Sequence, residues 1–125
     1  MTRFLSSWAP ALFCAGLIFY LSSQSNLAAV GYFPFSDKVA HFLLFAVFGM
    51  ALAWGGKHIS PIRLHAGLVL LGIVYGGLDE LHQSFVPLRH PSAGDLVADA
   101  LGVLVGYVLT AALLRARNKA QLNRL

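Results

Sequence analysis

The stretch LVADALGVLVGYVLTAALL, at residues 96–114, decides the fold, because only one charged side chain, Asp99, stands among its apolar residues. A helix needs roughly 20 mostly apolar residues to cross a bilayer, so this stretch is predicted to span a membrane. Three further stretches meet or nearly meet the same criterion: residues 4–21, 39–54 and 64–82. We therefore expect an all-α fold, a bundle of four transmembrane helices, forming one domain over residues 1–125.

The composition favours lipid as the solvent of this chain. Of its 125 residues, 58% are apolar and only 11% are charged, whereas a soluble domain has about 25% charged residues. The net charge of +4 does not indicate nucleic acid, because the basic residues stand where hydrophobic stretches end. No nucleic-acid partner is therefore expected.

The first apolar stretch could also be a signal peptide with Arg3 as its charged start. Pro10 in its core and the lack of a convincing small-x-small cleavage site argue against cleavage. Phe13, which precedes the single cysteine, Cys14, does not fit a lipoprotein cleavage site, so no lipid anchor is predicted.

The distribution of lysine and arginine predicts the orientation. With the N-terminus inside, seven basic residues fall on the inner side and two, Lys38 and Arg89, on the outer side. Cytoplasmic loops carry the excess of these residues, so we expect both termini in the cytoplasm and a multi-pass protein of the inner membrane.

All acidic residues fall on the outer side in this topology. The carboxylates are Asp37, Asp79, Glu80, Asp95 and Asp99. They are joined there by Lys38, His41, His82, Gln83, Arg89 and His90. Spacings of three or four residues place several of these side chains on shared helical faces. The pairs are Asp37 with His41, Asp79 and Glu80 with Gln83, and Asp95 with Asp99.

Glycines four residues apart continue the faces that carry the acids. Gly72 and Gly76 share the face of Glu80 in the third helix, and Gly102 and Gly106 share that of Asp99 in the fourth. Small residues at this spacing let membrane helices approach closely. We therefore expect the polar faces of the third and fourth helices to point at each other.

Purely structural roles compete with functional ones at the helix ends. Asp37 and Asp95 stand at helix N-termini, where the helix dipole favours a negative charge, and Ser92-x-x-Asp95 fits a capping box. Asp79 and Glu80 stand near a helix C-terminus, where the dipole opposes them. Placing an ionisable group at membrane depth costs free energy, so we expect Asp79 and Glu80 to have a functional or network role.

One series of residues joins these observations: Asp37-Lys38-x-x-His41-Phe42, Asp79-Glu80-x-x-Gln83-x-Phe85, Arg89, Ser92, Asp95, Asp99 and Gly102. The series resembles the VanZ-like family over residues 37–106, with Asp99 standing where many members carry Asn. The family is named for a protein linked to resistance to teicoplanin, a glycopeptide that targets cell-wall precursors outside the membrane. The resemblance implies a bacterial inner-membrane protein with an outward-facing polar site.

Three functions are compatible with this pattern. In the first, an outer cavity binds a membrane lipid or a lipid-linked cell-wall precursor. Lys38 and Arg89 would contact phosphate, while the ligand is oriented by Asp37, Asp79, Gln83 and Asp95. In the second, the protein is a hydrolase or transferase acting on a lipid-linked head group. Glu80 or Asp99 would be its general acid or base and His41 their partner. In the third, it is a small transporter, which would need oligomers, or a scaffold.

Metal binding by histidine and carboxylates is compatible with these residue types. The spacing matches no H-E-x-x-H zinc motif, and the sequence holds no G-x-S-x-G. No metal or other cofactor is therefore predicted from motifs.

Overall fold

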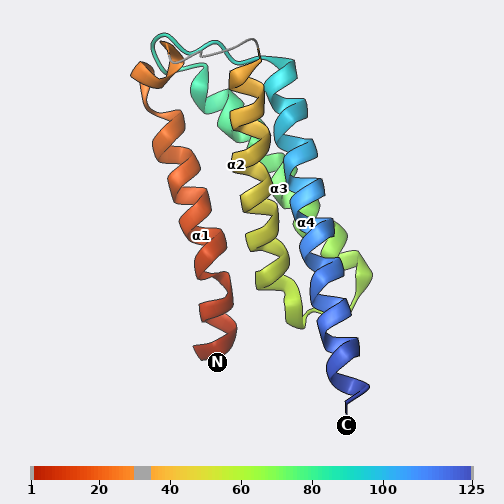
Figure 1. Cartoon of the computed structure of the whole chain (residues 1–125). Coiled ribbons are helices and arrows are strands. Elements are labelled where there is room, and N and C mark those ends of the chain that lie inside the picture. The colour runs from red at the N-terminus through yellow and green to blue at the C-terminus, as the bar shows by residue number, and fades with distance from the viewer. Residues whose placement is uncertain (1, 30–34, 125) are drawn as a thin grey trace.

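The computed structural model describes residues 2–29 and 35–124 and shows a bundle of long helices (Figure 1). The helices are α1 (Thr2–Ser22), α2 (Ser36–Gly55), α3 (Ile62–Gln83) and α4 (Ala93–Leu122), with short 3₁₀ segments η1 (Ser25–Ala29) and η2 (Gly56–His58). They run alternately up and down, so both chain termini lie at the same end of the bundle (Figure 1).

All four α-helices are long and apolar enough to cross a membrane. Large apolar side chains cover the outside of the bundle: Phe13 is 70% exposed and Leu109 is 60% exposed. Such a surface suits hydrocarbon and would be costly in water. The chain is therefore an all-α protein of the membrane-spanning type, as the sequence predicts.

The helix ends differ from the predicted ones mainly where polar residues continue a helix. α2 begins at Ser36, three residues before the predicted start, and so includes Asp37 and Lys38. α4 runs to Leu122, eight residues beyond the predicted end at residue 114. Its last turns hold alanine, arginine, lysine and glutamine, which favour helix without being apolar.

Glycines determine which helices lie closest, and part of the expectation about them needs correction. A methyl group on Gly102 or Gly106 would collide with the backbone of α2, at Phe42 and Ala46. The glycines of α4 therefore face α2 and not α3. Gly72 and Gly76 of α3 do face α4 as expected, because a methyl group there would meet Val103 and Asp99, respectively.

The core is centred on α2, which packs against α4, α1 and α3. Its fully buried side chains include Ile18, Phe45 and Val103, each at 0% exposure. Tyr75 of α3 joins the aromatic group around Phe45 and donates a hydrogen bond of 2.6 Å to the backbone carbonyl of Ala15 in α1. This packing fixes all four helices at the level just below the acidic residues.

Candidate functional site

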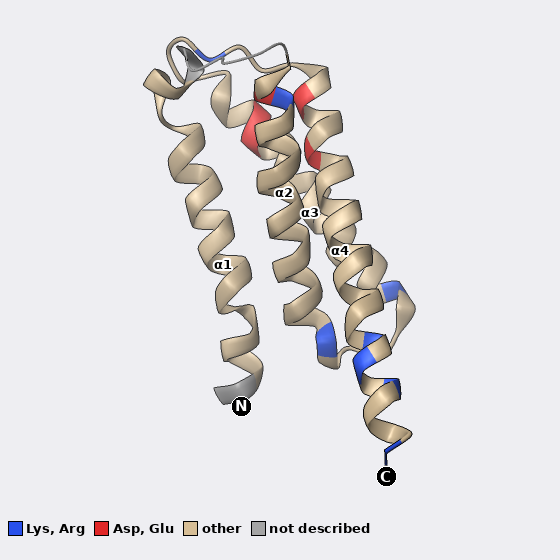
Figure 2. Cartoon of the chain, in the orientation of Figure 1, with Lys and Arg blue, Asp and Glu red and all other residues tan. Residues whose placement is uncertain are grey.

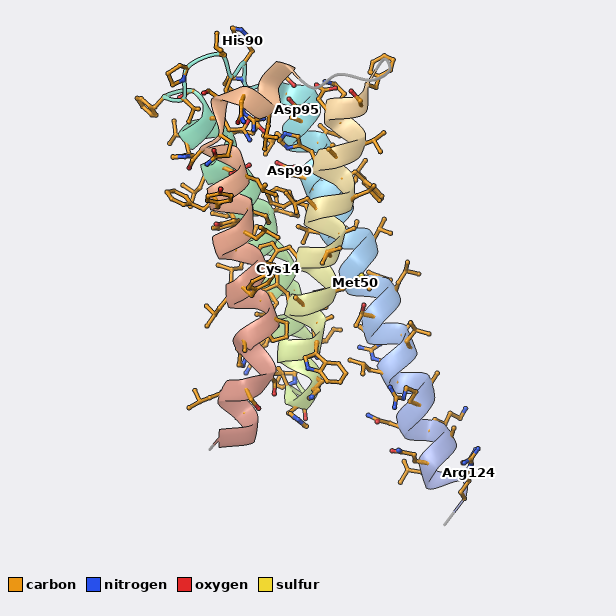
Figure 3. The ribbon with its side chains drawn as sticks, turned by 60° about the vertical axis from the view of Figure 1, so that its left-hand side comes forward. Cys14, Met50, His90, Asp95, Asp99 and Arg124 are labelled. Carbon is orange, nitrogen blue, oxygen red and sulfur yellow. The ribbon has the colours of Figure 1, made fainter. Side chains whose placement is uncertain are left out.

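The charged residues are divided between the two ends of the bundle (Figure 2). All five carboxylates lie at one end, called the acid end below, which also carries Lys38 (Figure 2). The opposite end, called the basic end, carries Lys57, Arg63, Arg115, Arg117, Lys119 and Arg124 (Figure 2). In the view of Figure 3, Asp95 and Asp99 lie near the top of the bundle, Cys14 and Met50 at mid-height and Arg124 at the far end.

Four of the acid-end side chains form a compact group, the acid–histidine cluster, which consists of His41, Asp79, Glu80 and Asp99. One ligand-type atom from each lies within 4.8 Å of the others. His41 Nδ1 is 2.9 Å from Asp99 Oδ1 and 3.6 Å from Glu80 Oε1. The three acids are buried, with Asp99 at 0%, Asp79 at 6% and Glu80 at 8% exposure.

Three different helices supply the cluster: α2 brings His41, α3 brings Asp79 and Glu80, and α4 brings Asp99. Gly76 makes room for the Asp99 side chain, since a Cβ atom on Gly76 would lie 2.9 Å from Asp99 Cβ. The predicted approach of the polar faces of α3 and α4 is thus observed at this point.

Glu80 also holds the start of α4. Its Oε2 accepts a hydrogen bond of 3.1 Å from the backbone N–H of Ser92, while Ser92 Oγ accepts one of 3.1 Å from the N–H of Asp95. The second of these is the N-cap bond that the sequence predicts. In a complete capping box the Asp95 side chain would bind the Ser92 N–H. Here Glu80 takes that place, which leaves the Asp95 carboxylate for another partner.

That partner is Lys38 on α2. Its Nζ lies 3.2 Å from Asp95 Oδ1 and 3.1 Å from Asp37 Oδ2. Asp95 is buried, whereas the Asp37 side chain is 59% exposed. Lys38 therefore joins α2 to the first turn of α4 and sits between two carboxylates.

Gln83 connects the cluster to α1. Its Nε2 donates to Asp79 Oδ2 at 3.0 Å and to Ser22 Oγ at 3.2 Å. Of the two acids that share its helical face, Gln83 thus binds Asp79 and not Glu80. Ser22 had no predicted role, and its signal in the sequence is a polar side chain at the end of an apolar stretch.

Arg89 contacts the chain itself. Its Nη2 donates to the carbonyl of Leu21 at 2.9 Å and its Nε to that of Gln24 at 3.2 Å. Leu21 lies in the last turn of α1 and Gln24 follows this helix, so Arg89 binds the chain around the C-terminal end of α1. His82, from the last turn of α3, bonds to Ser23 Oγ at 3.0 Å and so supports the same joint.

A cavity of about 540 Å³ lies beside the cluster. Its polar wall contains Ser22, Ser36, Asp37, His41, Asp79, Gln83, Arg89, His90 and Asp95. Its apolar wall contains Leu21, Leu27, Ala40, Leu44, Phe45 and Leu88. Eight of the nine predicted site residues line this cavity or belong to the cluster beside it. The ninth, Lys38, is bonded to Asp37 and Asp95. His90 is a lining residue that the sequence placed on this side without a role.

The fold and the site together define a membrane-spanning helical protein with a buried acidic and histidine cluster at one end of its bundle. The chain belongs to the VanZ/LLP1 family, whose model matches residues 6–115. No curated protein and no solved structure matches the chain.

Proposed function

We propose that this protein acts in the bacterial inner membrane, where it binds the polar head group of a lipid-linked envelope molecule from the extracytoplasmic side. The observation that carries the proposal is the mixed wall of the acid-end cavity. One part is built of carboxylate, amide and imidazole groups and another of leucines and Phe45. An amphipathic ligand needs both kinds of surface, and small-molecule sites combine them in this way.

The polar wall favours a head group rich in hydroxyl or amino groups. Asp37, Asp79 and Asp95 offer acceptors for such groups, and Gln83 offers a carbonyl oxygen. A phosphate on the same ligand would meet the positive charge of Arg89, which lines the cavity although two of its nitrogens are bonded to backbone carbonyls. Lys38 is bonded to Asp37 and Asp95, so its proposed effect on the ligand is indirect: it orients these two acids.

The proposed orientation rests on the charges of the two ends. With the basic end in the cytoplasm, seven of the nine lysine and arginine residues lie inside, in line with the positive-inside rule. Both termini are then cytoplasmic, and the acid-end cavity opens toward the leaflet in which cell-wall precursors carry their head groups. A role in the cell envelope, including glycopeptide resistance, is proposed on this placement and on the family.

The binding proposal is tested by blocking the cavity. Ala40→Trp fills it, because Ala40 lines its wall, and Val39→Trp is the matched control, because Val39 is 43% exposed and does not line it. Each protein is extracted with its surrounding lipid in polymer discs, and polyprenyl-phosphate-linked lipids are measured by mass spectrometry. We expect wild type and Val39→Trp to be enriched in such a lipid and Ala40→Trp to lose the enrichment. The same lipid profile in all three proteins would refute the proposal.

A membrane hydrolase or transferase acting on the same kind of head group is the second candidate function. It is favoured by His41, which lines the cavity and whose Nδ1 is held by Asp99 at 2.9 Å. A histidine oriented by a carboxylate is suited to move a proton during attack on a phosphate or ester. Turnover of polyprenyl diphosphate by the purified protein, lost in His41→Gln with lipid binding retained, would support this function. Absence of turnover in wild type would exclude that reaction.

A further inference from the structure

We propose that the acid–histidine cluster is a binding site for one divalent first-row transition metal ion, of the Mn²⁺ or Zn²⁺ type. His41 would contribute Nδ1, and Asp79, Glu80 and Asp99 would each contribute one carboxylate oxygen. The site stands on its own geometry, whichever head group enters the neighbouring cavity.

The first observation is that two buried carboxylate oxygens lack a hydrogen-bond partner, and one of them, Glu80 Oε1, has only the 3.6 Å contact with His41 Nδ1. Among the described residues, Glu80 Oε1 and Asp99 Oδ2 accept no hydrogen bond, although Glu80 is only 8% exposed and Asp99 is fully buried. Buried polar atoms are bonded in the great majority of cases, and each exception calls for a specific explanation. A bound cation would provide the missing partner for both atoms.

The second observation is the way the remaining oxygens are held. Gln83 donates to Asp79 Oδ2, and the backbone N–H of Ser92 donates to Glu80 Oε2. The Glu80 carboxylate therefore keeps Oε1 free of hydrogen bonds while its orientation is fixed, and Gln83 fixes the orientation of Asp79. Metal-binding carboxylates are typically oriented by outer hydrogen bonds of this kind.

The third observation concerns charge. Three carboxylates meet one imidazole, and within the described part of the chain no lysine or arginine forms an ion pair with Asp79, Glu80 or Asp99. The nearby lysine, Lys38, is bonded to Asp37 and Asp95. Unpaired charges are costly at membrane depth, so the cluster needs a positive partner. A divalent cation supplies it.

The spacing suits a transition metal after a small movement. Bonds to histidine nitrogen or carboxylate oxygen are about 2.0–2.2 Å long, so ligand atoms are about 3.5 Å apart in a tetrahedral site and up to about 4.4 Å apart where they lie on opposite sides of the ion. The four ligand atoms lie within 4.8 Å of one another. Side-chain rotations that bring the outermost atoms roughly 0.4–1.3 Å closer would complete the site, and helices α2, α3 and α4 each hold part of it.

The ligand types narrow the choice of metal. Calcium and magnesium prefer sites built of oxygen alone, and Cu(I) prefers sulfur. One imidazole with three carboxylates suits Mn²⁺, Fe²⁺ or Zn²⁺. Because His41 and Asp79 also line the cavity, the ion would lie at its wall.

The experiment uses the full chain without a histidine tag, purified in detergent and stripped of metal with a chelator. Mn²⁺ and Zn²⁺ are then added separately, and binding is measured by calorimetry and metal analysis. We expect one ion per chain in wild type and affinity at least about 10-fold lower in Asp99→Asn and Glu80→Gln, since even outer partners change metal affinity by about 10–100-fold. His82→Gln is the control, because His82 bonds to Ser23 outside the cluster, and it should bind as wild type does.

Spectroscopy of wild type gives a result that does not depend on whether the variants fold. Electron spin-echo measurements on the Mn²⁺-loaded protein should show coupling to one imidazole nitrogen, that of His41. Three results would each overturn the metal site: no stoichiometric binding of either ion, a Mn²⁺ signal without nitrogen coupling, or wild-type affinity in both folded carboxylate variants. In those cases protons neutralise the cluster, and the lipid-binding proposal is judged separately by the cavity-blocking variants.

Discussion

The two ends of this bundle differ in where their charged side chains lie: mostly buried at the acid end and mostly exposed at the basic end. At the acid end, Asp79, Glu80 and Asp99 are buried and directed toward other helices. At the basic end, Arg115, Arg117, Lys119 and Arg124 are exposed. A part-buried polar contact there is made by His65, which bonds to the Tyr107 hydroxyl at 2.6 Å and to the Ile59 carbonyl at 2.9 Å.

The contrast teaches where function is to be sought. Exposed lysine and arginine at a helix end reach the interface or water at little cost, and they also orient a membrane protein. Acids buried at membrane depth do not reach water, and their burial costs free energy, so such residues usually mark a functional site or a polar network. The acid end, with its cavity, is therefore the functional end in our account.

The largest effect on stability is expected from a substitution that separates α2 from α4. Gly106→Val should lower the free energy of unfolding by about 3 kcal/mol or more, because its side chain would overlap the backbone of α2 at Ala46 and force the helices apart. Gly67→Ala is the control, since a methyl group on Gly67 meets nothing within 4 Å. It should stabilise the helix by about 0.5–1 kcal/mol. Unfolding in mixed micelles measures both, and equal effects would contradict the packing described here.

A smaller but more informative effect comes from removing one lysine at each end. Lys38→Met should cost about 1–3 kcal/mol, because it leaves the buried Asp95 without its charged partner and increases repulsion among the acids. Lys119→Met changes an exposed residue and should stay within about 0.5 kcal/mol of wild type. The same unfolding measurement applies to both variants. A Lys38→Met protein as stable as the Lys119→Met protein would show that the acid end does not depend on this pairing.

The smallest effect is expected at the basic end. Tyr107→Phe removes the hydrogen bond to His65 and keeps the ring, which is 3% exposed. Single hydrogen bonds between membrane helices contribute about 0.6 kcal/mol on average, so the unfolding free energy should fall by about that amount. Lipid retention at the acid end should be unchanged. Loss of the bound lipid in this variant would mean that the two ends are not independent.

Apolar length was sufficient to predict the helices, because a membrane span is recognised by a property that each residue carries by itself. The end of α4 was placed too early since the criterion measures apolarity, whereas Arg115 to Leu122 continue the helix through backbone propensity. Helical spacing also predicted the cap at Ser92, and it placed Asp95 and Asp99 on one face of the fourth helix.

The contacts between helices could not be predicted in the same way. Glu80 binds the N–H of Ser92, and Arg89 binds carbonyls at the end of α1, across sequence separations that no local pattern covers. The cluster likewise takes its ligand-type atoms from three helices, so it matches no linear metal motif. The helix that the glycines of α4 face also depends on the tertiary arrangement, which spacing alone does not determine.

The most direct test of the central claim is the side of the membrane to which the acid end opens. In a Cys14→Ser background, which removes the single cysteine, Ser84→Cys marks the acid end and Asn118→Cys marks the basic end, and both positions are exposed. Intact spheroplasts are treated with a membrane-impermeant maleimide. Our account predicts that Ser84→Cys is labelled at once and Asn118→Cys only after the membrane is permeabilised. The reverse pattern would place the acid end in the cytoplasm and contradict the account.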